Sequence, residues 1–327
     1  MATEKSISFK NLLVGYNKSE NKFPKISSHV NHSELIILLG RNGVGKSTLL
    51  RTIAGLQSPV SGELTVMGHS IDSYSQKEKA SLISFVSTER LSVTNLSVYN
   101  LVSLGRYSYT NWLGTLSNED ETYVVKSMQM AGIYHLAEKN VNEISDGEMQ
   151  RVMIARTLAQ KTPIIILDEP TSFLDLPNKF EILLLLRNLA WSEGKTIILS
   201  THDLEIAMRL ADNMWIMTKE GLKQGAPEDF ALHNNLQDIF EDTNISYDYN
   251  KGIIDMGTNY CSRINLQCND SKINFWLTKA LNRLNYSIDP DSNKIIEATN
   301  NSYVYKSNGV VKKFTSVYDL VKFLRNC

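Results

Sequence analysis

Short apolar runs recur through the first two thirds of the chain and predict strands buried on both faces. They are Leu35–Leu39, Pro163–Leu167 and Thr196–Ser200, each about as long as a strand of a parallel sheet. Two segments of helical length, Lys46–Leu56 and Lys179–Trp191, follow the first and second runs. Because strands alternate with helices, the pattern predicts an α/β domain with a parallel core sheet.

The pattern changes between about Asn95 and Gln160, where helical periodicity continues without a strong strand. We interpret this stretch (about residues 95–160) as a helical subdomain inserted into the sheet domain. The pattern changes again after Gly221, where Glu228–Glu241 has the character of one or two short helices. Together these segments predict one large domain over residues 1–240.

A smaller unit is expected after a polar linker. Residues 241–260 are loop-like with one weak strand, and residues 261–327 carry the pattern of a small α+β domain. Its expected strands and helices are Arg263–Gln267, Ser271–Leu284, Lys294–Ala298, Ser302–Lys306 and a last helix from Ser316 to Arg325. No chemistry can be assigned to this appendage, so an additional dimer contact is our default interpretation.

Composition narrows the classes of function. The chain has 327 residues, 42% of them apolar, and a net charge of -1, which argues against a broad nucleic-acid-binding surface. Its longest aliphatic run, Ile182–Leu186, is far shorter than the about 20 residues of a membrane-spanning helix. Met1–Lys10 lacks the apolar core of a signal peptide, so we expect the chain in the cytosol. Cys261, Cys268 and Cys327 lack metal-ligand spacing and are expected as free thiols.

The segment from Gly40 to Ser47 matches the phosphate-binding pattern G-x-x-x-x-G-K-[ST]. Glycines let backbone N–H groups turn toward phosphate oxygens, and the following helix adds its positive N-terminal dipole. In this chemistry Lys46 reaches the β- and γ-phosphates and Ser47 ligates Mg²⁺. The alternative is a glycine-rich turn with a chance lysine, against which the flanking strand and helix argue. The expected ATP-binding residues are Gly40, Arg41, Asn42, Gly43, Val44, Gly45, Lys46, Ser47 and Thr48.

An acidic pair and a histidine follow two of the predicted strands. Asp168 and Glu169 come directly after Leu167, and His202 follows the run that ends at Ser200. A carboxylate at a buried strand end beside a phosphate loop suits Mg²⁺, so Asp168 is a candidate metal ligand. Glu169 can polarise a water toward the γ-phosphate, and His202 can contact that phosphate or water. A solvated acidic turn and a structural histidine are the alternatives. The expected catalytic residues are therefore Glu169, His202 and Lys46.

A further motif resembles the signature of the ABC ATPase family. Ile144–Arg151 reads I-S-D-G-E-M-Q-R and is similar to the family's L-S-G-G-Q-x-Q-R. The resemblance covers roughly residues 5–240. It implies a P-loop fold with a parallel core sheet, an antiparallel β subdomain and the helical insertion.

The resemblance also implies a head-to-tail homodimer. Each ATP would lie between the phosphate loop of one subunit and the signature of the other. Tyr16 stands where the family stacks an aromatic ring on adenine, although a surface tyrosine is the alternative. The residues that the resemblance adds to the ATP site are Tyr16, Ser145, Asp146, Gly147, Glu148 and the D-loop residue Asp175.

Some positions depart from the family pattern. Thr88, followed by Glu89, stands where the family has the Q-loop glutamine. Thr88 is a candidate Mg²⁺ ligand, because its hydroxyl can offer an oxygen directly or through a water. The signature carries Asp146 for glycine and Glu148 for glutamine. A helix N-terminus tolerates these negative charges, but they repel phosphate.

The stretch from Asn95 to Gly114 is similar to one subgroup, the ATPases of importers for iron-siderophores, haem and cobalamin. It contains Leu104-Gly105-Arg106-Tyr107. In the family this segment receives a coupling helix of the integral-membrane permease, so the resemblance implies docking there. Packing inside the helical subdomain is the alternative for each aromatic side chain. The aromatics that suit a docking groove are Tyr99, Tyr107, Tyr109 and Trp112.

The function implied by the resemblance is hydrolysis of ATP, with Mg²⁺, to energise such an importer. The chain would be peripheral, at the cytoplasmic face of the cell (inner) membrane, with two copies on a permease and no nucleic-acid partner. Two alternatives stay open, a soluble ABC switch without a permease and a weakly hydrolysing ATP-binding regulator. The chain lacks the second ATPase domain or long coiled-coil insert typical of the first, and Glu169 and His202 argue against the second.

We predict that Thr88 slows hydrolysis or changes its coupling to transport, because the family has glutamine at that position. ATPase rates of Thr88→Gln and of the unaltered protein should therefore differ when measured with and without the permease. Identical rates under both conditions would contradict this prediction.

Overall fold

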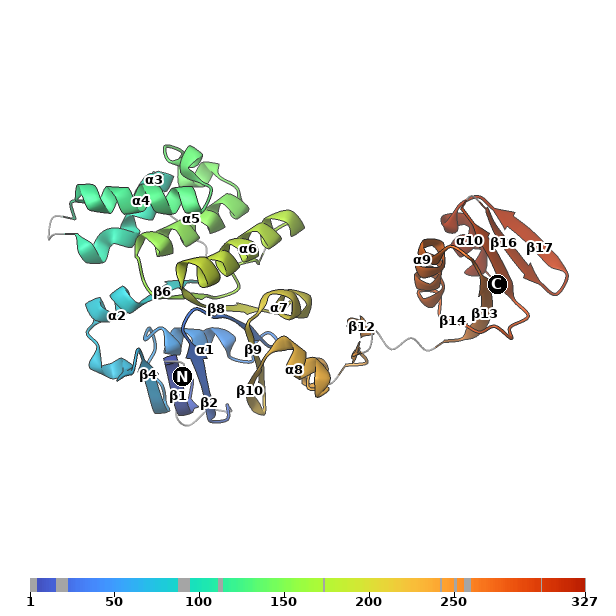
Figure 1. The fold of residues 1–327 in the computed structure, drawn as a ribbon, viewed down its shortest axis with the longest axis horizontal. Coiled ribbons are helices and arrows are strands. Elements are labelled where there is room, and N and C mark those ends of the chain that lie inside the picture. The colour runs from blue at the N-terminus through green and yellow to red at the C-terminus, as the bar shows by residue number, and fades with distance from the viewer. Residues whose placement is uncertain are drawn as a thin grey trace. The chain divides into compact units, whose positions relative to one another are not determined.

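The computed structural model describes residues 5–15, 23–87, 95–110, 114–172, 174–241, 243–249, 252–255, 260–300 and 302–326. The chain forms two compact units, residues 1–239 and 240–327, which can be followed along the colour bar of Figure 1. Each unit buries its own cluster of apolar side chains.

A six-stranded sheet forms the centre of the first unit. Its strands are β3 (Leu35–Leu39), β6 (Ile83–Val86), β7 (Ile164–Leu167), β8 (Thr196–Thr201), β9 (Asn213–Thr218) and β10 (Gly221–Gly225). They lie in the order β10-β9-β3-β8-β7-β6, with every pair parallel except β10 and β9. β3, β7 and β8 are buried along their whole length. The predicted α/β fold with a parallel core sheet is confirmed.

A second sheet of the same unit is antiparallel, as the resemblance implies. It consists of β1 (Lys5–Leu13), β2 (Ile26–Asn31), β4 (Ser61–Val66) and β5 (His69–Ser70), in the order β2-β1-β4-β5. The two sheets share one apolar core with α1 (Lys46–Ile53). Within it the rings of Phe9 and Trp215 meet edge to face, with their centroids 5.5 Å apart.

Helices make up the rest of the first unit. They are η1 (Ile71–Ser73), α2 (Gln76–Leu82), α3 (Val98–Ser103), η2 (Leu104–Tyr109), α4 (Asn118–Met130), η3 (Tyr134–Leu136), η4 (Val141–Glu143), α5 (Asp146–Ala159), α6 (Leu176–Glu193), α7 (Leu204–Leu210), α8 (Pro227–Leu232) and η5 (Gln237–Phe240). Figure 1 shows α3, α4 and α5 packed together in green. In the described part of residues 95–160 the only β pairing is a single bridge between Ser97 and Asn140.

A buried ion pair holds this helical layer together. Arg106, at the end of α3 in η2, is 4% exposed and places its guanidinium 2.8 Å from the Asp120 carboxylate of α4. The same guanidinium donates to the backbone oxygen of Ala159 at the end of α5 and stacks on the rings of Tyr109 and Tyr123. The hydrogen bond from the Ser117 hydroxyl, with help from Arg106, lowers the pKa of Asp120. Arg106 therefore connects three helices.

The neighbouring residues divide between packing and surface. Gly105 lies so close to α5 that a Cβ atom would come within 2.2 Å of the Arg156 oxygen, so only glycine fits there. The Tyr107 side chain is 74% exposed and Tyr109 is 43% exposed, whereas Tyr99 is half-buried. Trp112 lies outside the described residues. Tyr107 is thus available to a partner, while Tyr109 is tied down by Arg106 and by a hydrogen bond to the Gln160 oxygen.

The second unit is a five-stranded sheet with two helices on one face. It consists of β13 (Ser262–Gln267), α9 (Ser271–Asn282), β14 (Tyr286–Ile288), β15 (Ile295–Thr299), β16 (Ser302–Ser307), β17 (Val310–Phe314) and α10 (Val317–Leu324), with strand order β14-β13-β15-β16-β17. Side chains of α9 and α10 share one buried cluster with β13, β15 and β16. The sequence analysis missed β14 and β17. β14 has only three residues, and β17 is exposed along most of an edge, so neither has a strong apolar pattern.

The expected linker also contains more structure than predicted. Residues 241–260 were expected to hold one weak strand, but two short strands, β11 (Ser246–Asp248) and β12 (Ile253–Asp255), pair as an antiparallel hairpin. A hairpin of three residues per strand carries little periodicity, which explains why the sequence pattern indicates a loop. Among the described helices of both units, none combines the length and the apolar character needed to cross a membrane.

We predict that Arg106→Ala destabilises the first unit by roughly 3–5 kcal/mol, because it leaves the Asp120 carboxylate buried without its cation. Denaturant unfolding measures this loss. The lowered pKa of Asp120 adds stability that is present above the ordinary aspartate pKa and is lost as the pH falls and the carboxylate takes up a proton,. The penalty of Arg106→Ala should therefore shrink in acid.

Tyr107→Ala is the matched control for this substitution. It removes a large side chain from the adjacent position, but one that is mostly exposed, so the free energy of unfolding should change by less than about 0.5 kcal/mol. Equal losses for Arg106→Ala and Tyr107→Ala would contradict the assignment of the buried ion pair.

Candidate functional site

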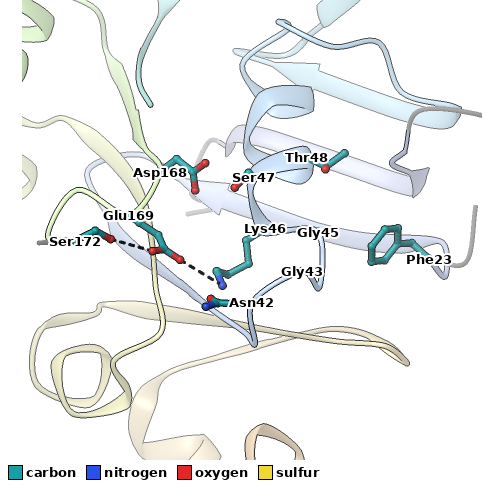
Figure 2. A pocket seen from close by; sticks show the side chains of 10 residues that line it. All are labelled: Phe23, Asn42, Gly43, Gly45, Lys46, Ser47, Thr48, Asp168, Glu169 and Ser172. Carbon is teal, nitrogen blue, oxygen red and sulfur yellow. Dashed lines mark hydrogen bonds and ion pairs between the residues drawn. The ribbon is translucent and has the colours of Figure 1, made fainter. Parts of the chain in front are cut away.

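One cavity brings the phosphate loop together with the acidic pair Asp168 and Glu169. Its volume is about 550 Å³, and it opens at the carboxyl ends of the parallel strands β3 and β7. Figure 2 shows the side chains around it. The lining residues are Phe23, Asn42, Gly43, Gly45, Lys46, Ser47, Thr48, Asp168, Glu169 and Ser172.

The phosphate loop owes its shape to two glycines. A Cβ atom at Gly40 would lie 2.7 Å from the Met217 oxygen of β9, so the loop can leave β3 only at a glycine,. Gly45 has a φ of 101° and is the N-cap of α1, a left-handed conformation that L side chains avoid. Because Gly45 has no side chain to cap the helix, the first N–H groups of α1 remain for an anion. Val44 instead points into the core, and Arg41 is exposed.

Lys46 is a buried cation at the base of the cavity. Its Nζ donates to the backbone oxygens of Gly40 at 2.7 Å and Arg41 at 3.2 Å. It also lies 3.7 Å from a carboxylate oxygen of Glu169. Burial lowers the pKa of the Lys46 ammonium, and the carboxylates of Glu169 and Asp168 partly oppose that shift. The ammonium is therefore held within the loop that it would share with phosphate groups.

Ser200 joins the two acidic residues. Its hydroxyl, at the end of β8, donates to Oδ1 of Asp168 at 2.7 Å and accepts the backbone N–H of Glu169 at 2.9 Å. The backbone N–H of Asp168 donates to Val86 of β6. These contacts fix the Asp168 carboxylate in a site where it is only 3% exposed. The sequence analysis missed Ser200, although a hydroxyl directly after the aliphatic run Ile197–Leu199 was a detectable signal.

Glu169 lies at the centre of a short chain of polar side chains. Its backbone φ of 46° turns the residue out of the strand direction, a conformation that costs energy for a non-glycine residue. Ser172 donates to Glu169 Oε2 at 2.9 Å, and His202 Nδ1 lies 3.7 Å from that same oxygen. Figure 2 shows the Glu169 carboxylate between Lys46 and Ser172. The structure thus brings together the three expected catalytic residues Lys46, Glu169 and His202.

The oxygen donors of the cavity fit a magnesium ion. The Ser47 hydroxyl and the Asp168 carboxylate both line it, and hard oxygen ligands are those that Mg²⁺ prefers. Among the described residues, no group of three or more His, Cys, Asp or Glu side chains could hold a metal. A site with one carboxylate and one hydroxyl agrees with Mg²⁺, which commonly takes its other ligands from waters and substrate phosphates.

The signature residues lie elsewhere. None of Ser145, Asp146, Gly147 or Glu148 lines the cavity of the same chain, and Ser145 and Asp146 are exposed. Ser145 caps α5 in a reciprocal capping box, in which its N–H and hydroxyl donate to Glu148 at 2.7 and 2.9 Å. Those bonds lower the pKa of Glu148. The Glu148 carboxylate therefore holds the Ser145 hydroxyl in a fixed orientation.

Of the other expected site residues, Asp175 is described by the structure, whereas Tyr16 and Thr88 are not. The D-loop residue Asp175 caps α6 through a hydrogen bond from the Asn178 N–H. Tyr16 and Thr88 lie outside the described residues. Phe23, which the sequence analysis did not single out, lines the cavity beside Gly45. A lone aromatic shortly before β2 carries no pattern that could have indicated this position.

Family models match both units of the chain. The model of the ABC transporter family matches residues 23–172, and that of the iron ABC transporter C-terminal domain matches residues 261–325.

Individual relatives agree with these matches. An achromobactin transport ATP-binding protein of Dickeya dadantii is 39% identical over 72% of this chain and 87% of its own length. An uncharacterized ABC transporter ATP-binding protein of Methanocaldococcus jannaschii is 37% identical over 76% of this chain and 86% of its own length. The ferric enterobactin transport ATP-binding protein of Escherichia coli is 36% identical over 70% and 84%.

Solved structures give the same result. A metal-chelate type ABC transporter in an inward-facing conformation matches with a TM-score of 0.64 and 30% identity, over 72% of this chain and 89% of that one. A dimeric bacterial ABC transporter cassette matches with a TM-score of 0.60 and 27% identity, over 68% of this chain and 98% of that one.

We predict that Ser200→Ala raises the Mg²⁺ concentration needed for half-maximal ATP hydrolysis, because Asp168 loses the hydrogen bond that orients it. A supporting residue of this kind typically contributes about 10–100-fold to metal affinity or activity. Magnesium titrations of the ATPase rate measure the effect. Ser84→Ala is the matched control, since it removes another buried strand hydroxyl, on β6. Equal magnesium affinities in the two variants would contradict the role of Ser200.

Proposed function

The chain belongs to the ABC transporter family of ATP-binding proteins and is an ATPase, and we propose that it energises an importer of iron chelates. The observation that carries the energising role is the convergence of Lys46, Asp168 and Glu169 on one cavity at the edge of the core sheet. Relatives named for transport of achromobactin, ferric enterobactin and iron(3+)-hydroxamate support the class of cargo. The match of the second unit to an iron-transporter family model supports it independently.

Phosphate binding is the task of the loop and of α1. Backbone N–H groups from Gly43 to Ser47 and the helix dipole favour anions. The Lys46 ammonium, which now donates to two carbonyl oxygens of the loop, would form stronger charge-assisted bonds with the β- and γ-phosphates. Phe23 offers an apolar wall at the same end of the cavity.

Hydrolysis requires a positioned water beside the γ-phosphate. Glu169 suits the acceptor of that water's proton, because its carboxylate lies in the cavity and is oriented by Ser172,. His202, 3.7 Å from Glu169, can orient the same water or a phosphate oxygen. Mg²⁺ held by Ser47 and Asp168 would neutralise charge on the phosphates during transfer. Catalysis in this site is mainly positioning and electrostatic stabilisation.

A second copy would complete the site. Ser145 and Asp146 are exposed and do not reach the cavity of their own chain, which supports their expected role against the ATP of a partner subunit. One of the similar structures is a dimeric cassette, which supports the association of two copies. Asp175, at the exposed N-terminus of α6, would approach that interface.

The permease would dock on the segment from Asn95 to Gly114. Support comes from Tyr107, which is exposed although its neighbours Gly105 and Arg106 are buried. Tyr107 would therefore contact the permease. Arg106 would keep rigid the helical layer that carries Tyr107. Peripheral attachment to the cytoplasmic face of the inner membrane, through the permease, follows from this arrangement.

We predict that Glu169→Gln with ATP forms a stable closed dimer whose turnover falls at least about 100-fold, since the proton acceptor is lost while ATP binding is kept. Size-exclusion chromatography with light scattering measures the dimer, and phosphate release measures turnover. A monomer in ATP, or unchanged turnover, would refute the assigned role.

Lys46→Ala is the control for this experiment, because it removes a phosphate contact and should leave a monomer with or without ATP. Isolation of the Glu169→Gln dimer from cells then tests the transport role. Co-purification with a two-subunit permease is the expected result. A dimer that never associates with membrane proteins would instead favour a soluble switch.

A further inference from the structure

Residues 261–327, which form the five-stranded sheet and the two helices of the second unit, carry an excess of positive charge that the rest of the chain does not share. Between residues 261 and 327 there are ten Lys or Arg residues against five Asp or Glu, although the whole chain has a net charge of -1. The excess is not spread evenly over this unit. In α9 and α10, which cover one face of its sheet, Asp319 is the only acidic residue.

The outer face of α9 combines cations with exposed aromatics. Lys272, Phe275, Trp276, Lys279 and Arg283 follow one another at helical spacing from α9 to the residue after it, and all are exposed. Phe275 and Trp276 are 53% and 59% exposed, with ring centroids 5.3 Å apart. Large exposed aromatics rarely lie together on a surface without a partner.

The outer face of α10 continues that of α9. Tyr318, Lys322 and Arg325 lie on one side of α10 and are exposed. They line a surface hollow of about 450 Å³ together with Arg283 of the α9 end and the apolar Val321. Because Arg283 belongs to both sets, the two helices present one continuous surface. We call it the basic-aromatic face.

We infer that the basic-aromatic face binds the surface of a membrane that contains anionic phospholipid. Lys and Arg residues near such a surface are attracted by its negative potential. Phe, Trp and Tyr side chains are favoured at the boundary between headgroups and acyl chains. Arg283, Lys322 and Arg325 border the hollow, so their charged ends can pair with phosphate headgroups, and Val321 adds an apolar floor. The family operates in membrane transporters, so such a surface lies near the protein in use.

Two other occupants fit the face less well. A second copy bound through the same face would oppose five cations with five cations, because a two-fold contact brings each patch against itself. A free phosphate would explain the hollow, but not the exposed rings of Phe275 and Trp276, which lie on α9 outside it. A lipid surface accounts for both the charges and the rings.

The test uses the full-length protein and vesicles of phosphatidylcholine with or without phosphatidylglycerol. We expect co-sedimentation with the anionic vesicles and little with the neutral ones. Neutralising two cations in the double variant Arg283→Gln, Lys322→Gln should lower the partition coefficient roughly 25-fold, about fivefold for each charge. Trp276→Ala should lower it severalfold without changing its dependence on salt.

The matched control removes two cations from the opposite, open face of the same sheet. Arg263→Gln with Lys313→Gln makes the same change in net charge. Arg263 and Lys313 directly precede Ile264 and Phe314, whose side chains pack in the core. Successive side chains of a strand point to opposite faces, so both cations lie on the open face. Binding should change by less than about twofold, because those charges face away from the bound membrane and salt screens their attraction to it. Circular dichroism verifies that every variant is folded.

Several outcomes would overturn the inference. They are equal binding to neutral and anionic vesicles, no binding to either, equal losses in the control pair, or binding of a single-stranded oligonucleotide in place of vesicles. A dimer of the unaltered protein that the Arg283 and Lys322 variant dissociates, without vesicle binding, would assign the face to a second copy. ATPase activity in the absence of vesicles should be the same in all variants. A failed vesicle experiment therefore does not contradict the proposed transport function. Failure of the permease experiment, in turn, does not contradict binding to vesicles.

Discussion

Parallel pairing of the central strands is the constraint on which the rest of the structure depends. β3 pairs with β8 and β9, and β8 pairs with β7, so the carboxyl ends of these strands lie along one edge of the sheet. The register aligns Leu39 with Thr201 and Leu167 with Leu199. Residues that follow the strands, from the phosphate loop to Glu169 and His202, are therefore neighbours in space. Gly40 is required at that edge because the backbone of β9 comes so close.

Side-chain hydrogen bonds convert this common edge into a site. Ser200 fixes Asp168 and the backbone of Glu169, and Ser172 fixes the Glu169 carboxylate. Lys46 is buried against the loop carbonyls and faces Glu169. Such supporting contacts limit the motion of the side chains that they hold, and fixed positions are what catalysis by orientation requires. The signature residues from Ser145 to Glu148 do not line this cavity in their own chain.

Adjacent residues carry different roles in two surfaces of the molecule. In η2, Gly105 and Arg106 are committed to packing, while Tyr107 projects into solvent. In α9, Leu277 and Leu281 pack on the sheet, while Phe275 and Trp276 remain exposed. In both cases the inward-facing side chains of the helix supply stability, and the outward-facing side chains remain exposed to solvent. Helical periodicity is what allows one short segment to serve both purposes.

The sequence by itself determined the parallel α/β core, the phosphate loop, the acidic pair and the existence of a second α+β unit. These features are local, because strand runs, loop spacing and helix caps are recorded in consecutive residues. It did not determine β14, β17 or the β11–β12 hairpin, which are short or exposed and depend on pairing with distant strands. Only the tertiary structure decided that Ser200 holds Asp168, that Arg106 is buried against Asp120 and that α9 and α10 present one face. Each of those contacts joins residues far apart along the chain, and no local pattern records such a distance.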